Sequence, residues 1–228
     1  MALIDRELML LGSFAGTAVQ PATVASGRSP FVECVKRSID IVGAVVLVVL
    51  LLPVFILTAI GVYAGDGTPI IHRRRVVGQK GEFDAFKFRT MRRDADSLLT
   101  KEPKLLAEYQ RNFKLVNDPR VTKIGALLRK LSVDELPQLF NVLLGQMSLV
   151  GPRIITKPEL AKYGSHSQLL LSCKPGLTGY WQVFGRQQVS YEERVRMDVY
   201  YLQNWSLALD LLLLLRTPLK VLNMGGAF

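Results

Sequence analysis

Two adjacent carboxylates, Asp134 and Glu135, are the residues of this sequence with the clearest capacity for chemistry. They lie in the segment LSVDELPQL at residues 131–139, near the start of a region predicted to be helical. Neighbouring helical residues point about 100° apart, so the two acids cannot share one task but can divide the work. One carboxylate could attack an electrophilic phosphorus while the other helps to hold a magnesium ion or a water. The alternative is structural, because acids at a helix N-terminus compensate the helix dipole.

A set of basic residues could supply the phosphate contacts that such a reaction needs. If the fold gathers them, five side chains suit a diphosphate: Lys87, Arg89, Arg129, Arg153 and Arg186. The sequence has no glycine-rich phosphate loop, which argues against an ATPase or a dinucleotide-dependent dehydrogenase. The two histidines, His72 and His166, lack the spacing of zinc ligands, and Cys173 lacks an obvious base.

The overall composition points to a membrane surface. The 228 residues are enough for one domain or two at most, and they combine a net charge of +10 with 49% hydrophobic residues. Basic proteins that bind nucleic acid are usually polar, so this pairing favours a bilayer or a phosphate-bearing lipid, with no nucleic acid as partner. The apolar content excludes a disordered chain. Only Cys34 and Cys173 are present, as expected for a protein of a reducing compartment.

Much of the apolar material lies between positions 41 and 64, a run of 24 residues without a charge. A helix of that length reaches about 36 Å, enough to cross the hydrocarbon core of a bilayer. Basic residues flank both ends, although a simple span normally has them at one end. Pro53 lies halfway and removes a helical hydrogen bond. We therefore predict a re-entrant membrane segment, residues 35–66, that bends at Pro53 and returns to the cytoplasmic face.

The rest of the chain predicts an α+β fold, mostly helical with one small β-hairpin. Residues 70–77 and 83–89 are expected to be strands, and residues 94–116, 121–130 and 136–144 to be helical. Pro137 is tolerated only in a first turn, so the N-cap of the last helix is expected at Val133 or Asp134. Residues 205–222 either lie in the membrane interface as interfacial helices or pack on the domain. Residues 1–34 are expected to be a mobile leader, and residues 67–228 a cytosolic catalytic domain with membrane-associated helices.

Several ordered sequence blocks run from about Lys36 to Val221. They are KRSID at 36–40, KFRTM at 87–91, DPRVT at 118–122, LRKLSVDELPQL at 128–139, MSLVGPR at 147–153, PGLTG at 175–179, and NWS at 204–206 with Asp210. In these blocks the chain resembles the bacterial sugar transferases that begin exopolysaccharide repeat units, the small monotopic polyprenyl-phosphate phosphoglycosyltransferases. Gly185-Arg186 and the VSY sequence at 189–191 resemble the short hexose-phosphate transferases, such as the one that initiates succinoglycan.

The resemblance implies a reaction. A UDP-sugar, with glucose or galactose as the sugar, would donate its sugar-1-phosphate to undecaprenyl phosphate and release UMP. Asp134 would attack the β-phosphorus and carry the phosphosugar, Glu135 would support it, and Mg²⁺ would assist. The residues implied around the site are Lys87, Arg129, Arg153, Arg186 and Asp210. Those implied to anchor the re-entrant helix are Lys36, Arg37 and Asp40.

The resemblance also implies a location and partners. The enzyme would lie in the bacterial inner membrane with its catalytic domain on the cytoplasmic face. The bilayer, downstream glycosyltransferases and further copies of the chain would be its partners. One departure concerns the bend, because Leu52 precedes Pro53 where relatives usually have a serine. The alternative from another functional class is a non-catalytic, membrane-anchored basic protein that binds anionic lipid or RNA. Such a protein would explain the positive charge, but not the presence of two acids among arginines.

Overall fold

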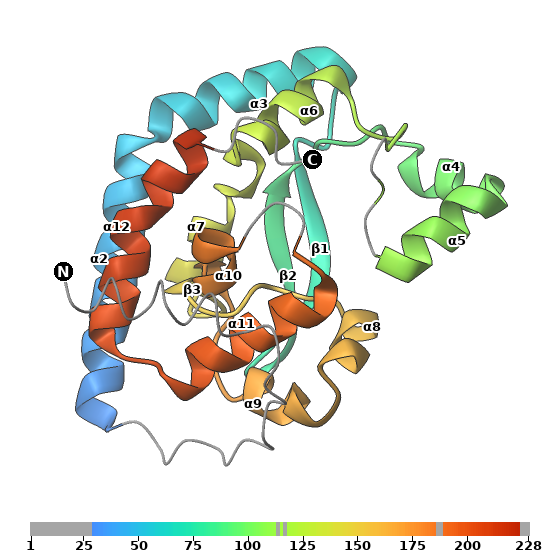
Figure 1. The fold of residues 1–228 in the computed structure, drawn as a ribbon. Helices are drawn as coiled ribbons and strands as arrows, with labels where there is room; N and C mark the ends of the chain where they lie inside the picture. Colours follow the sequence, from blue (N-terminus) through green and yellow to red (C-terminus); the bar gives the residue numbers. More distant parts are fainter. Residues whose placement is uncertain (1–28, 113–114, 116–117, 186–188, 224–228) are drawn as a thin grey trace.

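A bent pair of helices forms one side of the molecule (Figure 1). The structure is a computed structural model that describes residues 29–112, 115, 118–185 and 189–223. Helix α2 (Pro30–Leu50) and helix α3 (Leu52–Asp66) meet at Leu51 with a bend of 62°. Pro53 stands in the first turn of α3, where its missing N–H leaves no helical bond unmade. The predicted bend is therefore present, and it falls two residues before the proline.

The bent pair carries the long apolar run of the sequence. Among the described residues no single helix is long and apolar enough to cross a bilayer, whereas α2 and α3 together could be by length and composition. Large apolar side chains stay exposed along both helices, including Val42, Val49, Leu57 and Ile60. The expected leader at residues 1–34 is too long, because α2 already begins at Pro30, a residue suited to a helix start. The rest of that leader lies outside the described residues.

A mixed helical and β-stranded domain follows the bent pair (Figure 1). Its elements are, in chain order, β1 (Ile71–Gly78), β2 (Gly81–Phe88), α4 (Ala95–Lys101), α5 (Pro103–Asn112), α6 (Lys123–Lys130), the 3-10 turn η1 (Val133–Glu135), α7 (Gln138–Leu143), β3 (Ser148–Val150), α8 (Lys157–Leu160), the 3-10 helix η2 (Ala161–His166), α9 (Ser167–Leu171), β4 (Gly176–Thr178), α10 (Tyr180–Phe184), α11 (Tyr191–Gln203) and α12 (Leu207–Asn223). The α+β class predicted from the sequence is confirmed.

The hairpin is the most regular of the predicted elements. Strands β1 and β2 pair antiparallel from Ile71 opposite Phe88 to Gly78 opposite Gly81, which leaves a two-residue turn. Gly81 has φ +104°, a conformation that glycine adopts without strain. A second small sheet pairs β3 with β4 in parallel.

Two helix predictions need correction. The expected helix at residues 94–116 is two helices, α4 and α5, because Pro103 starts a new one. The expected helix at 136–144 begins at Gln138 with Pro137 as its N-cap, so an N-cap at Val133 or Asp134 was wrong. The two acids instead occupy the separate turn η1 just before that helix.

Helix α2 is fixed to the domain by two charged side chains on one of its faces. Arg37 donates to the carbonyls of Val142 at 2.7 Å and Leu143 at 2.9 Å, at the C-terminal end of α7, where the helix dipole favours a positive charge. Asp40 is buried and accepts hydrogen bonds from the Ser148 hydroxyl and the Leu149 N–H, both at 2.9 Å. Polar contacts, rather than apolar packing alone, therefore set the position of α2.

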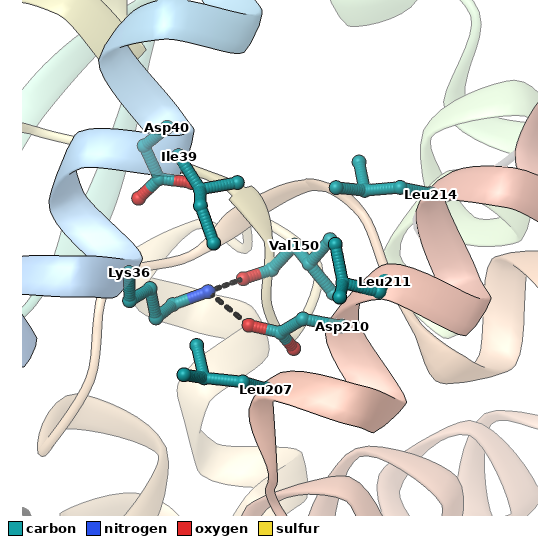
Figure 2. Close-up of a pocket in the computed structure, with 8 residues that line it drawn as sticks. All are labelled: Lys36, Ile39, Asp40, Val150, Leu207, Asp210, Leu211 and Leu214. Atoms are coloured by element: carbon teal, nitrogen blue, oxygen red, sulfur yellow. Dashed lines mark hydrogen bonds and ion pairs between the residues drawn. The ribbon is translucent and has the colours of Figure 1, made fainter. Parts of the chain in front are cut away.

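A third charge joins α2 to α12 (Figure 2). Lys36 Nζ lies 2.5 Å from Asp210 Oδ2 and 3.1 Å from the Val150 carbonyl. Asp210 also accepts from the Tyr201 hydroxyl at 2.8 Å and from Trp205 Nε1 at 3.1 Å. The pair is almost fully desolvated, so each charge depends on the other.

Helix α12 packs on the domain through one face. Leu213 is fully buried in the core, while Leu211, Leu215 and Leu219 are exposed in a row at intervals of four residues. Of the two possibilities left open by the sequence, packing of residues 205–222 on the domain is therefore confirmed for α12. Its opposite face still presents an apolar stripe beside α2.

Removal of the Asp210 charge is expected to loosen α12. Asp210→Asn leaves Lys36 without its carboxylate partner, and we expect a loss of about 2 kcal/mol in the free energy of unfolding. Lys36→Met in the Asp210→Asn background should recover part of it. Thermal melting in detergent measures both effects. An unchanged melting temperature in Asp210→Asn would contradict this structural role.

Candidate active site

The acid pair lies in a turn held in an unusual backbone conformation. Ser132, directly before η1, has φ +54° and ψ +19°, and no other non-glycine residue in the described ranges has a positive φ. Its N–H donates to the Arg129 carbonyl at 3.0 Å, and the Leu136 N–H donates to the Val133 carbonyl at 3.2 Å. A left-handed non-glycine residue costs about 1–2 kcal/mol. Strain of this kind gathers at functional sites, where the surrounding structure holds it.

Substitutions at Ser132 should separate backbone strain from side-chain chemistry. Ser132→Gly relieves the strain, so we expect unchanged transfer activity and equal or higher thermal stability. Ser132→Val adds a β-branched side chain that disfavours the left-handed conformation, so both activity and stability should fall. Melting curves together with rates of catalytic turnover test this pair. A loss of activity in Ser132→Gly with normal melting would assign the hydroxyl a direct part in the chemistry.

Glu135 is held by two cations. Its Oε1 atom lies 2.5 Å from Lys87 Nζ and 3.1 Å from Arg153 Nη2. Burial alone would raise the pKa of this carboxyl, but the charges of Arg153 and Lys87 outweigh burial and lower it to about 2. Glu135 therefore stays ionised at neutral pH and holds both cations in place.

Asp134 has the opposite environment. It is only 8% exposed, and within the described part of the chain its carboxylate has no hydrogen bond or ion pair. Burial, followed by the negative charge of Glu135, raises the pKa of Asp134, while Lys87, Arg129 and Arg153 act in the other direction. A buried, unpartnered carboxylate surrounded by cations is suited to act as a nucleophile, because no hydrogen bond to its lone pairs has to be broken.

Arg129 is placed by the contact between α6 and the segment after β2. Thr122 caps α6 by accepting from the Gly125 N–H at 2.9 Å, and its own N–H donates to the Thr90 carbonyl at 3.0 Å. A Cβ at Gly125 would collide with the Thr90 backbone, so only glycine allows this approach. Arg129 Nε then donates to the Thr90 hydroxyl at 2.9 Å. The KFRTM and DPRVT blocks thus lie side by side. Their contact orients Arg129, whose positive charge acts on Asp134.

Arg153 is placed by a second close backbone contact. The loop after β3 bonds to β4 through Gly151 N to Thr178 O at 3.0 Å and Gly176 N to Pro152 O at 2.8 Å. A Cβ on Gly176 would collide with the backbone at Gly151, so glycine is required there. The MSLVGPR and PGLTG blocks are therefore neighbours, and their contact fixes where Arg153 leaves the backbone.

The structure brings together most of the expected site residues. Lys87, Arg129 and Arg153 all act on the acid pair. Arg89 does not, because its guanidinium donates to the Asp66 and Gly67 carbonyls, both at 2.8 Å, and closes the end of α3. Asp210 is likewise engaged elsewhere, between α2, α11 and α12. Arg186 lies outside the described residues.

Two residues that the sequence analysis did not single out, Trp181 and Arg194, also adjoin the site. Arg153 Cζ lies 5.6 Å from the centre of the Trp181 ring, and Arg194 Cζ lies 4.7 Å from the same ring. Trp181 comes two residues after the PGLTG block, and this position could have indicated it. Arg194 lies inside α11 without a comparable sequence signal.

One known protein family matches almost the whole of this fold. The family described as "Bacterial sugar transferase" matches residues 31–224, from the first turn of α2 to the end of α12. This chain belongs to the bacterial sugar transferase family. The resemblance read from the sequence blocks is confirmed.

Individual members of the sugar transferase family are similar over most of this chain. The "UDP-galactose-lipid carrier transferase" of Erwinia amylovora is 44% identical over 197 residues, covering 85% of this chain and 41% of that protein. "Exopolysaccharide production protein ExoY" of Rhizobium meliloti is 44% identical over 197 residues, covering 84% and 87%. The "Undecaprenyl-phosphate galactose phosphotransferase" of Salmonella typhimurium is 43% identical over 198 residues, covering 85% and 41%. The chain thus spans about two fifths of two of these relatives and most of the third.

The acid pair of this sugar transferase also bears on metal binding. Within the described ranges no group of three or more His, Cys, Asp or Glu side chains could form an all-protein metal site. Magnesium is commonly held by one or two carboxylates together with substrate phosphates, and Asp134 and Glu135 supply two. The unpartnered oxygens of Asp134 fit such a donor set.

Proposed function

We propose that this sugar transferase moves a hexose-1-phosphate from a UDP-sugar to a polyprenyl phosphate, namely undecaprenyl phosphate, and releases UMP. The product would start a polysaccharide repeat unit. The observation that carries the proposal is the contrast within the acid pair, with Asp134 buried and unpartnered and Glu135 tied to two cations. The names of the Erwinia and Salmonella relatives support the donor, the lipid acceptor and galactose as one candidate sugar. Glucose is the other sugar that we propose to test.

In the first step Asp134 attacks the donor. A carboxylate oxygen of Asp134 forms a bond to the β-phosphorus, and the bond from that phosphorus to the bridging oxygen breaks, so that UMP leaves with the oxygen. The sugar phosphate is then held as an acyl phosphate on Asp134. Lys87, Arg129 and Arg153 lie where they offset the negative charge of the donor and favour the ionised form of Asp134.

In the second step the lipid phosphate takes the place of the donor. One of its oxygens attacks the same phosphorus, the bond to Asp134 breaks, and the carboxylate is restored. Division of one transfer into two lets a water-soluble donor and a membrane-bound acceptor use a single site in turn. Magnesium, held by Asp134, Glu135 and phosphate oxygens, would supply further charge neutralisation.

The membrane arrangement is part of the same proposal. The bent pair α2 and α3 would enter the inner membrane from the cytoplasmic face and return to it, because basic residues flank both ends. The exposed leucines of α12 would lie at the interface beside this pair. The catalytic domain would then face the cytoplasm, next to the phosphate groups of the acceptor lipid.

Cys34 offers a direct test of this topology. Cys34 is exposed near the start of α2, whereas Cys173 is buried. We expect a membrane-impermeant maleimide to leave Cys34 unlabelled in intact spheroplasts and to label it in inside-out vesicles. A Cys34→Ser variant controls for labelling at other sites. Labelling of Cys34 in sealed spheroplasts would contradict the re-entrant arrangement.

The activity is tested by UMP release from UDP-glucose and UDP-galactose in detergent, with and without undecaprenyl phosphate. We expect rapid release with the lipid and magnesium, a single-turnover burst without the lipid, and none after chelation of divalent ions. A donor radiolabelled in the β-phosphate should label wild-type protein in the absence of lipid. No release from any donor, with lipid or RNA binding retained, would favour the non-catalytic alternative.

A further inference from the structure

Helix α12 carries a set of polar side chains that the proposed chemistry does not use. Arg216, Thr217 and Lys220 form the polar face of α12, since positions 216 and 220 lie about one helical turn apart. All three are half-buried, whereas the neighbouring Leu215 and Leu219 are exposed. The polar face of α12 therefore contacts another part of the domain, and that part is the segment of residues 176–185, which holds β4 and α10.

Thr217 connects α12 to β4. Its hydroxyl lies 2.9 Å from the Thr178 hydroxyl and donates to the Leu213 carbonyl at 2.7 Å, so Thr178 is the donor between the two threonines. The Thr178 carbonyl in turn accepts from the Gly151 N–H at 3.0 Å. Gly151 lies two residues before Arg153. Thr217 is thus joined, through β4, to the loop from which Arg153 extends.

Arg216 and Lys220 connect α12 to the end of α10. Arg216 Cζ lies 5.0 Å from the centre of the Phe184 ring. Lys220 Nζ donates to the Gly185 carbonyl at 3.0 Å, and the Gly185 N–H donates to the Trp181 carbonyl at 2.7 Å. A Cβ on Gly185 would collide with that same carbonyl, so only glycine allows this approach. Lys220 is therefore joined through one residue to the backbone of Trp181.

Both connections lead to Arg153. Its guanidinium lies 3.1 Å from Glu135, and its Cζ lies 5.6 Å from the centre of the Trp181 ring. We propose that the three residues of the polar face of α12 are positioning residues, which hold residues 176–185 so that β4 and Trp181 keep Arg153 beside the acid pair. When a donor phosphate competes with Glu135 for this guanidinium, the support from α12 remains.

Hydrogen exchange tests this placement without any assumption about the reaction. Thr217→Val removes a hydroxyl at nearly constant shape, and Lys220→Met removes a donor at similar length. In the double variant we expect about two- to tenfold faster deuterium uptake in peptides covering residues 149–153 and 176–185. The hairpin at 71–88 should exchange as in wild type. Unchanged uptake at 149–153 and 176–185, or equal increases along the whole chain, would overturn the proposal.

Lys104→Met is the matched control for the loss of a lysine. Lys104 is exposed on α5, on the opposite side of the molecule from α12 (Figure 1). This variant should exchange like wild type at residues 149–153 and 176–185. Faster uptake there in Lys104→Met, equal to that in Lys220→Met, would also contradict a specific role for the polar face of α12.

Turnover then tests the consequence, and this part rests on the proposed function. Lys220→Met should lower kcat about 10-fold, with the KM for the UDP-sugar changed less than about threefold, because Arg153 is misplaced rather than removed. In a Trp181→Leu background the same substitution should lower kcat less than about twofold, since residues that act through one another are not additive. Full additivity would overturn the connection through Trp181. A wild type that releases no UMP would refute the proposed function, while the exchange result would still decide the positioning.

Discussion

Asp134→Asn is expected to abolish UMP release and transfer to lipid, by at least about 1000-fold, while the protein stays folded. An amide cannot form the acyl phosphate, so protein labelling by a β-phosphate-labelled donor should also disappear. Stability should be equal or higher. Because the pKa of Asp134 is raised, its carboxyl favours the folded state only while protonated and weakens the fold as pH rises above 3.8. Asparagine does not ionise and avoids that loss.

Rates, covalent labelling and melting temperature should be measured on one preparation of Asp134→Asn. Glu108→Gln is a suitable control, because it also replaces a carboxylate by an amide but lies exposed on α5. It should retain wild-type rates. Label that persists on Asp134→Asn, or transfer within about tenfold of wild type, would contradict the assignment of Asp134 as nucleophile.

Glu135→Gln is expected to lose much stability as well as activity, whereas Asp134→Asn is expected to lose activity alone. Glu135 has a pKa of about 2 in the fold against an ordinary value of 4.5, because Arg153 and Lys87 outweigh the effect of burial. At about 1.4 kcal/mol for each pH unit, this shift contributes about 3 kcal/mol at neutral pH. A lowered pKa stabilises the fold above 4.5, and the contribution is lost as pH falls from 4.5 towards 2. Glutamine lacks this contribution and leaves Lys87 and Arg153 without their shared partner.

Melting temperatures of wild type and Glu135→Gln should therefore differ most at neutral pH and converge as pH falls below about 4.5. Transfer activity should fall as well, because Lys87 and Arg153 lose the carboxylate that holds them. Glu108→Gln again serves as the control and should melt like wild type from pH 7 down to the acid range. A difference that stays constant to pH 3 would show that the two ion pairs do not stabilise the fold.

The hairpin, the bend and the family were predictable because their signals are local. The turn composition at residues 78–81 specifies the hairpin, and Pro53 specifies an interruption in an apolar helix. The boundary errors also have local causes. Pro103 divides an otherwise continuous helical pattern, and Pro137 delays the start of α7 until Gln138. In each case the proline overrode a favourable pattern of neighbouring side chains.

The sequence alone determined that this chain has a bent apolar segment, an acid pair and enough basic residues to bind phosphates. It could not say which cations reach the pair, because residue type and spacing do not define long-range contacts. Tertiary structure selected Lys87, Arg129 and Arg153, used Arg89 to close α3, and used Asp210 to hold α12 to α2. Tertiary structure also made the two acids unequal, since burial without a partner and burial between two cations shift a carboxyl pKa in opposite directions.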